Sequence, residues 1–96
     1  MIKVNVIGYA ARIFGRHTYE VPARPRMTLR DLLAELAREA PPDSRRQIYD
    51  EGSDGLPGHL TIFVNSREAR SLLGLDTELR DGDVITLLPP VAGGKA

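Results

Sequence analysis

The sequence contains no cysteine. Without cysteine the chain can form no disulfide, no iron–sulfur cluster and no zinc–thiolate site, and it has no thiol nucleophile. Chemistry that needs a cysteine side chain is therefore excluded.

The chain also lacks an excess of either charge and a long apolar run. Thirteen Lys and Arg residues balance thirteen Asp and Glu residues, so the formal net charge is zero. No basic excess typical of nucleic-acid binding is present, and the apolar runs are far shorter than a membrane span. The sequence starts directly in a strand pattern and not with a signal peptide. We therefore expect a cytoplasmic protein with no nucleic-acid or membrane partner.

The composition is that of one small soluble domain. Of the 96 residues, 42% are apolar and 27% are charged, which argues against disorder. A chain of this length can form one modest core, but not a core plus a deep substrate cavity. We expect a single domain over residues 1–88 and a flexible tail over residues 89–96.

Four segments have the pattern of β-strands. Ile2, Val4 and Val6 alternate with polar residues, which is typical of a half-buried strand. Gly15 lies between this strand and the next, which favours a hairpin, and Pro22 ends the second strand. The expected strands cover residues 2–7, 17–21, 60–64 and 84–88.

One helix is expected to begin at Thr28 and to end at about Ala40. The Thr28 hydroxyl can accept a hydrogen bond from a free backbone amide of the first turn, and Asp31 completes an approximate capping box. Two prolines after Ala40 end the helix. The apolar stripe that would pack on the sheet consists of Leu29, Leu32, Leu33, Leu36 and Ala40.

The remaining segments are connections. Residues 43–59 are polar and glycine-rich and are expected to form a long loop, with a short helical turn over residues 47–49. Turns are expected at Asn65-Ser66 and at Asp81-Gly82-Asp83. A short apolar connection between these turns contains Leu72, Leu73, Leu75 and Leu79. This order of elements predicts an α+β fold of two layers, with one main helix across one face of a mixed sheet of four to five strands.

The last expected strand is followed by Pro89-Pro90-Val91-Ala92-Gly93-Gly94, and the two prolines favour an extended arm without a sheet partner. Together with Asp81-Gly82-Asp83-Val84 this ending resembles that of the molybdopterin synthase small subunit family, one of the MoaD/ThiS-like sulfur carriers. These carriers have the ubiquitin-like β-grasp fold. The opening strand, the Phe14-Gly15 region and the order of elements also match, so the resemblance covers nearly the whole chain.

The resemblance implies a sulfur carrier and not an enzyme. In such carriers a ubiquitin-activating-like adenylating enzyme uses ATP to activate the terminal glycine carboxylate, which then becomes a thiocarboxylate. Gly94 would carry this reactive group, and Gly93 would give clearance in a narrow channel because it has no Cβ. The other residues that would thread the channel are Pro89, Pro90, Val91 and Ala92. The carrier itself would bind no cofactor and no metal.

The chain departs from the family pattern at its end, because Lys95 and Ala96 follow the second glycine. An amide at Gly94 cannot be adenylated. A processing peptidase removes the two residues, or they are left over from cloning, or the chain is inactive as a carrier. The sequence leaves these three explanations open.

Strand alternation predicts a surface for a partner protein. If Val6, Ile62 and Leu87 face the helix, then Ile7, Phe63 and Leu88 point away from it. Three large apolar residues on an otherwise polar face could form a docking patch beside the start of the arm. Coverage of these residues by the long loop or by a dimer is the alternative, and single exposed apolar residues are also common.

No other motif indicates a site. His17 and His59 have no companions at the spacing of a metal site or a catalytic triad, so each is interpreted as a surface or strand histidine. The glycines at 52, 55 and 58 lack the lysine of a phosphate-binding loop.

Three functions agree with this sequence. The first is a sulfur carrier for molybdenum cofactor biosynthesis, with the large subunit of molybdopterin synthase as its partner. A close variant delivers sulfur to another acceptor enzyme, in cysteine or thiamine biosynthesis. The second is a ubiquitin-like modifier that forms isopeptide bonds with lysines of other proteins. The third is a β-grasp interaction module whose arm is never activated.

Overall fold

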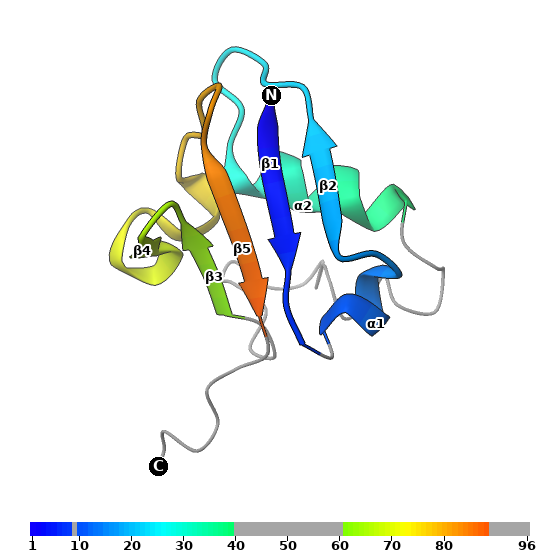
Figure 1. Cartoon of the computed structure of the whole chain (residues 1–96). Helices are drawn as coiled ribbons and strands as arrows, with labels where there is room; N and C mark the ends of the chain where they lie inside the picture. Colours follow the sequence, from blue (N-terminus) through cyan, green and yellow to red (C-terminus); the bar gives the residue numbers. More distant parts are fainter. Residues whose placement is uncertain (9, 40–60, 89–96) are drawn as a thin grey trace.

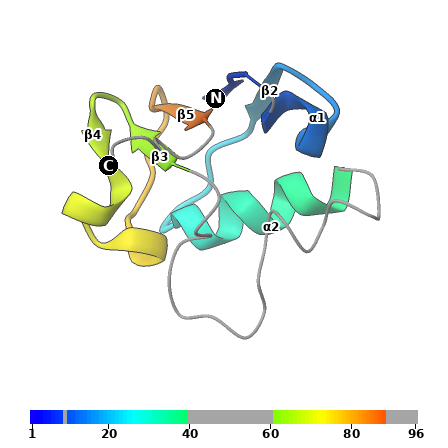
Figure 2. The ribbon, with the colours of Figure 1, turned by 90° about the horizontal axis from the view of Figure 1, so that it is seen from below.

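The computed structural model describes residues 1–8, 10–39 and 61–88. These residues form a five-stranded sheet with one long helix on one face, as Figures 1 and 2 show. The strands are β1 (Ile2–Val6), β2 (Thr18–Val21), β3 (Thr61–Val64), β4 (Arg67–Glu68) and β5 (Val84–Leu88). The helices are α1 (Ala10–Phe14) and α2 (Leu29–Glu39), and the 3₁₀ turns are η2 (Ala69–Ser71) and η3 (Gly74–Asp76). The predicted α+β architecture of two layers is confirmed.

The sheet is mixed, with the strand order β2-β1-β5-β3-β4. The first and last strands, β1 and β5, pair in parallel at its centre, with Val4 beside Ile85 and Val6 beside Leu87. The other pairs are antiparallel. Because β1 and β5 run in the same direction, both strands end at the same edge of the sheet (Figure 1).

The alternation of the strands separates a core face from an outer face. On β1 the side chains of residues 2, 4 and 6 are buried, and β3 and β5 alternate in the same way. Five side chains of α2 cover this core face, namely Leu29, Leu32, Leu33, Leu36 and Ala37. The predicted helix stripe is confirmed over its four leucines, and its last member, Ala40, lies outside the described residues.

The predicted start of α2 is also confirmed. The backbone amide of Asp31 donates to the Thr28 Oγ1 (3.3 Å), and the backbone amide of Thr28 donates to the Asp31 Oδ2 (3.0 Å). These two bonds are the reciprocal pair of a capping box, with aspartate in place of the more common glutamate. They satisfy amides at the end of the helix that have no partner within it.

The connection between β1 and β2 differs from the expected hairpin turn. The two strands do pair antiparallel, but the short helix α1 lies between them. The Ala11 amide donates to the Gly8 carbonyl (3.1 Å), and the Gly15 amide donates to the Ala11 carbonyl (2.7 Å). Gly8 and Gly15 both have positive φ (66° and 81°), a conformation that glycine adopts without steric cost. The glycines therefore bound a single helical segment that hydrophobic alternation could not reveal.

The connection between β3 and β5 contains more structure than predicted. Asn65 and Ser66 form the expected turn, and it leads into the short edge strand β4. Of the leucines in the apolar connection, Leu75 and Leu79 are buried in the core and Leu72 packs against it. Leu73 instead is 73% exposed. The two 3₁₀ turns explain this difference, because they direct neighbouring leucines to opposite sides.

Asn65 links the turn after β3 to the start of β5. Its φ is 58°, its Oδ1 accepts a hydrogen bond from the Val84 amide (3.0 Å), and its Nδ2 donates to the Asp83 Oδ1 (3.1 Å). Asparagine is among the residues that tolerate a left-handed conformation.

Two predicted features lie outside the described residues: the loop over residues 43–59 with its helical turn, and the arm over residues 89–96. Within residues 1–8, 10–39 and 61–88, no helix has both the length and the apolar character that a membrane crossing requires.

Removal of the capping carboxylate should destabilise the fold. We expect Asp31→Ala to lower the free energy of unfolding by about 1 kcal/mol, because the Thr28 amide loses its acceptor. Asp31→Asn keeps an acceptor oxygen and should lose less. Urea denaturation of the three proteins checks this, and equal stability of Asp31→Ala and the wild type would contradict it.

Two substitutions at Asn65 should separate backbone strain from side-chain hydrogen bonding. We expect Asn65→Ala to cost about 2 kcal/mol, because alanine combines the lost hydrogen bonds with the steric cost of positive φ. Asn65→Gly loses only the hydrogen bonds and should cost about half as much. Thermal and urea unfolding provide the comparison, in which a glycine variant less stable than the alanine variant would disprove this account of the turn.

Candidate functional site

The predicted arm, Pro89, Pro90, Val91, Ala92, Gly93 and Gly94, lies outside the described residues. The part of the site that the structure describes is therefore the end of the sheet at which β5 reaches Leu88. Two features meet there, an apolar surface on the sheet and a hollow beside α1.

Ile7 and Leu88 lie side by side at this end of the sheet. The Ile7 amide donates to the Leu87 carbonyl (2.8 Å), which extends the parallel ladder of β1 and β5 by one residue. Ile7 is 52% exposed, and Leu88 is half-buried. Both positions belong to the face that points away from α2, because they alternate with the buried Val6 and Leu87.

Phe63 completes this surface from the neighbouring strand. In the antiparallel pair of β3 and β5, Thr61 lies opposite Leu88 and Phe63 lies opposite Thr86. Phe63 is thus a diagonal neighbour of Leu88, at a distance that aromatic side chains can bridge. We call Ile7, Phe63 and Leu88 the outer patch. The structure brings these three predicted residues to one region of one face; their role as a docking patch stays a prediction.

The residues next to the outer patch are mostly uncharged. Asn5 pairs with Thr86 across β1 and β5, and Thr61 faces Leu88. A carboxylate, Glu68, lies opposite Phe63 on β4. Farther along the same face, Lys3 and Glu20 are cross-strand partners on β1 and β2.

A hollow of about 360 Å³ lies beside α1, next to the outer patch. Its lining residues are Gly8, Ala11, Arg12, Gly15, Arg16 and His17. We call it the basic hollow, because the charged or titratable side chains among its described lining residues are two arginines and a histidine. Sequence reasoning did not identify Arg12 or Arg16 as site residues, since only the unpredicted helix α1 brings them together.

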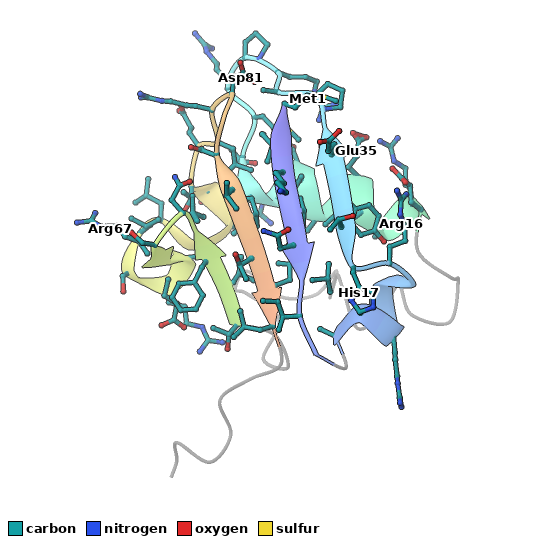
Figure 3. All side chains as sticks on the ribbon, in the orientation of Figure 1. Met1, Arg16, His17, Glu35, Arg67 and Asp81 are labelled. Carbon is teal, nitrogen blue, oxygen red and sulfur yellow. The ribbon has the colours of Figure 1, made fainter. Side chains whose placement is uncertain are left out.

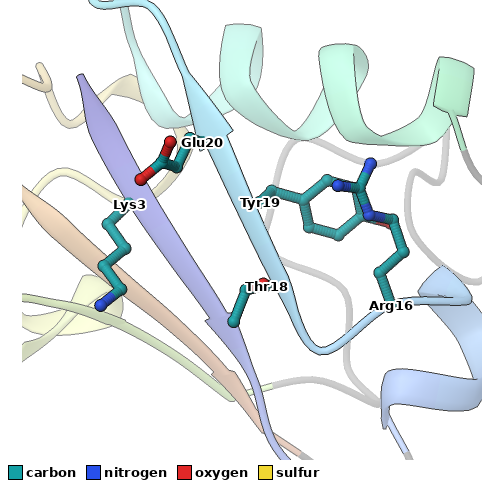
Figure 4. A pocket seen from close by; sticks show the side chains of 5 residues that line it. All are labelled: Lys3, Arg16, Thr18, Tyr19 and Glu20. Carbon is teal, nitrogen blue, oxygen red and sulfur yellow. The ribbon is translucent and has the colours of Figure 1, made fainter.

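Arg16 is held at one wall of the basic hollow. Its guanidinium carbon lies 4.7 Å from the centre of the Tyr19 ring, and its Nη1 lies 3.3 Å from the Glu39 Oε1 at the end of α2. Burial raises the pKa of the Tyr19 hydroxyl; the positive charge of Arg16 opposes this rise and the negative charge of Glu39 adds to it. Figure 4 shows Arg16 stacked on Tyr19, where the two residues also line a second hollow of about 440 Å³ along β2.

The two histidines were interpreted from the sequence as surface or strand residues. His17 is an exposed residue directly before β2, as the sequence indicated, and Figure 3 places it beside α1. His59 lies outside the described residues. In the described part of the chain, no three His, Cys, Asp or Glu side chains gather closely enough to hold a metal ion.

Known proteins resemble this chain along most of its length. A protein of Archaeoglobus fulgidus described as a sulfur carrier protein is 36% identical over 69 residues, which are 72% of this chain and 76% of that protein. Small archaeal modifier protein 3 of Haloferax volcanii is 37% identical over 67 residues, 70% of either chain.

The fold is shared with a solved structure from Pyrococcus furiosus, described as molybdopterin converting factor, subunit 1. The TM-score is 0.71 at 26% identity, and the match covers 94% of this chain and 97% of that one. The β-grasp fold expected from the sequence is thus confirmed. The sequence model of the ThiS family matches residues 4–94. The chain is a member of the ThiS family, whose relatives described above are sulfur carriers and ubiquitin-like small modifiers.

Proposed function

We propose that this chain is a sulfur carrier that works through the backbone carboxylate of Gly94. The observation that carries the proposal is the extent of the family match, which covers residues 4–94 and ends at Gly94. Lys95 and Ala96 lie outside that match. The relative described as a sulfur carrier supports the same function.

The proposed chemistry has two steps. An adenylating partner enzyme binds ATP, and an oxygen of the Gly94 carboxylate attacks the α-phosphate, which releases pyrophosphate and forms an acyl-adenylate. A donor at the oxidation level of sulfide then attacks the acyl carbon, and AMP leaves with the electron pair of the broken C–O bond. The product is a thiocarboxylate whose sulfur is the nucleophile for the final acceptor.

In this scheme the chain supplies the carboxylate that reacts and the domain that positions it, and we propose no catalytic role for its side chains. Gly93 and Gly94 have no Cβ, so a narrow channel in the partner can admit them. Pro89 and Pro90 are residues that favour an extended backbone. The β-grasp domain serves as the part that partner enzymes recognise.

Docking would place the outer patch against the partner enzyme. The patch lies around Leu88, the last described residue before the arm, so a partner that covers Ile7 and Leu88 has the arm next to its own surface. Clusters of large apolar side chains with a polar surround are typical of such interfaces. The proposed partners are a ubiquitin-activating-like enzyme in the cytoplasm and a sulfur acceptor enzyme.

We propose molybdenum cofactor biosynthesis as the pathway that receives the sulfur, with the molybdopterin synthase large subunit as the acceptor enzyme. The shared fold with the Pyrococcus furiosus protein supports this choice. An acceptor in cysteine or thiamine biosynthesis would use the same activated Gly94. In either pathway a peptidase must first remove Lys95 and Ala96.

A second candidate function is protein modification. The 37% identity to small archaeal modifier protein 3 favours it, because the same acyl-adenylate can pass to a lysine amine and form an isopeptide bond. The chain has only two lysines of its own, Lys3 and Lys95, so targets would be other proteins.

Mass spectrometry of a version ending at Gly94 tests the carrier. After incubation with the adenylating enzyme of the same organism, ATP and sulfide, we expect an intact mass in which one oxygen is replaced by sulfur. The 96-residue chain is the matched control and should not change, because its Gly94 carboxyl group is an amide. A stable adduct on lysines of added cell proteins would favour the modifier, and an unchanged mass with every such enzyme would refute activation.

The outer patch can be tested by a matched pair of substitutions. We expect Ile7→Glu to raise the KM for the carrier in ATP–pyrophosphate exchange about tenfold, because a loss of roughly 1.4 kcal/mol of binding corresponds to that factor. Leu73→Glu is the control, since Leu73 is even more exposed but belongs to the connection between η2 and η3. Its KM should stay within about twofold of the wild type. Equal effects of the two substitutions would argue against the patch.

A further inference from the structure

The basic hollow begins directly after the outer-patch residue that follows β1. Ile7 belongs to the patch, and the next residue, Gly8, lines the hollow. On the other side, the Val6 amide donates to the His17 carbonyl (2.8 Å), so the His17 wall is bonded to the end of β1. Figure 1 shows α1 at the edge of the sheet where the arrows of β1 and β5 end.

The charges of the hollow are unbalanced. Arg12, Arg16 and His17 line it, and none of the lining residues that the structure describes is a carboxylate. Arg16 already has a partner in Glu39. Within the described part of the chain, Arg12 forms no ion pair. A surface hollow with an arginine that has no described ion-pair partner fits a negatively charged group, and a carboxylate can accept two hydrogen bonds from one guanidinium.

We propose that the adenylating enzyme docks on this chain in two places at once, with an apolar side chain on the outer patch and a carboxylate-bearing segment in the basic hollow. The inference rests on the proposed function and specifies the partner's chemistry: an acidic residue or loop next to an apolar anchor. Arg12 supplies the principal contact, while Arg16, held by Tyr19 and Glu39, forms a fixed wall.

A protein segment suits the hollow better than a free anion does. The hollow is open, and Arg16 is 57% exposed, so solvent screens the attraction for a single small ion. An acidic residue delivered together with the apolar anchor binds at high effective concentration, and its charge also steers the encounter. The contact should therefore act mainly on affinity, on association rate and on salt dependence.

The test measures binding and adenylation separately. The version ending at Gly94 is titrated with the adenylating enzyme of the same organism, without ATP, at low and high sodium chloride. We expect Arg12→Glu to raise the Kd about tenfold at low salt and to flatten the dependence of Kd on salt. In ATP–pyrophosphate exchange the same variant should show a raised KM with kcat unchanged.

Arg67→Glu is the matched control. It makes the same charge reversal on an exposed arginine that forms no ion pair in the described residues, and it lies on β4 at the opposite side of the sheet from His17 (Figure 3). Its Kd should change by about twofold or less. Circular dichroism and thermal unfolding establish that both variants fold.

The outcomes separate this inference from the proposed function. If Arg12→Glu binds like Arg67→Glu while adenylation proceeds normally, the two-part docking surface is wrong and the carrier function stands. If the chain binds in the predicted salt-dependent way but is never adenylated, the carrier function is wrong. Amide chemical shifts can show whether inorganic phosphate binds in the hollow. If phosphate binds there and Arg12→Glu leaves the Kd for the enzyme unchanged, the hollow is a site for a small anion and the proposal is overturned. Absence of any binding contradicts both.

Discussion

Parallel hydrogen bonding between β1 and β5 determines how the rest of this molecule is arranged. These two strands come first and last in the sequence but lie next to each other in the sheet, and their pairing places Val6 beside Leu87. The C-terminal ends of β1 and β5 consequently lie at the same end of the sheet. Ile7, the basic hollow and Leu88 come together for this reason, although about eighty residues of sequence separate Ile7 from Leu88.

The elements with a strong periodic signal were predictable from the sequence. The leucine stripe of α2, its capping box and the alternation of the core strands each depend on residues a few positions apart, so local pattern suffices. The short elements α1 and β4 were not predictable in this way. Five residues, Ala10–Phe14, cannot show helical periodicity, and the two residues of β4 form a strand only because β3 lies beside them.

In the candidate site, too, the residues in regular strands were predictable and those that depend on α1 were not. Ile7, Phe63 and Leu88 could be assigned to the outer face by counting from buried neighbours, because a strand alternates strictly. Their proximity also required the register of β1, β5 and β3, which no single segment encodes. Arg12 and Arg16 remained unrecognised, since their shared hollow depends on α1 and on two glycines with positive φ. The arm was assigned by resemblance to a family; the ThiS match shows membership of that family, and the role of the arm's residues stays a prediction.

The position of β5 between β1 and β3 has a mechanical consequence. A partner that pulls on the chain beyond Leu88 applies force along the strand, and the hydrogen bonds to both neighbouring strands then resist together in shear. An edge strand such as β2 or β4 would have only one row of bonds and could peel away. A load applied to the chain after Leu88 is therefore shared by two rows of hydrogen bonds, and the core strands resist it better than an edge strand would.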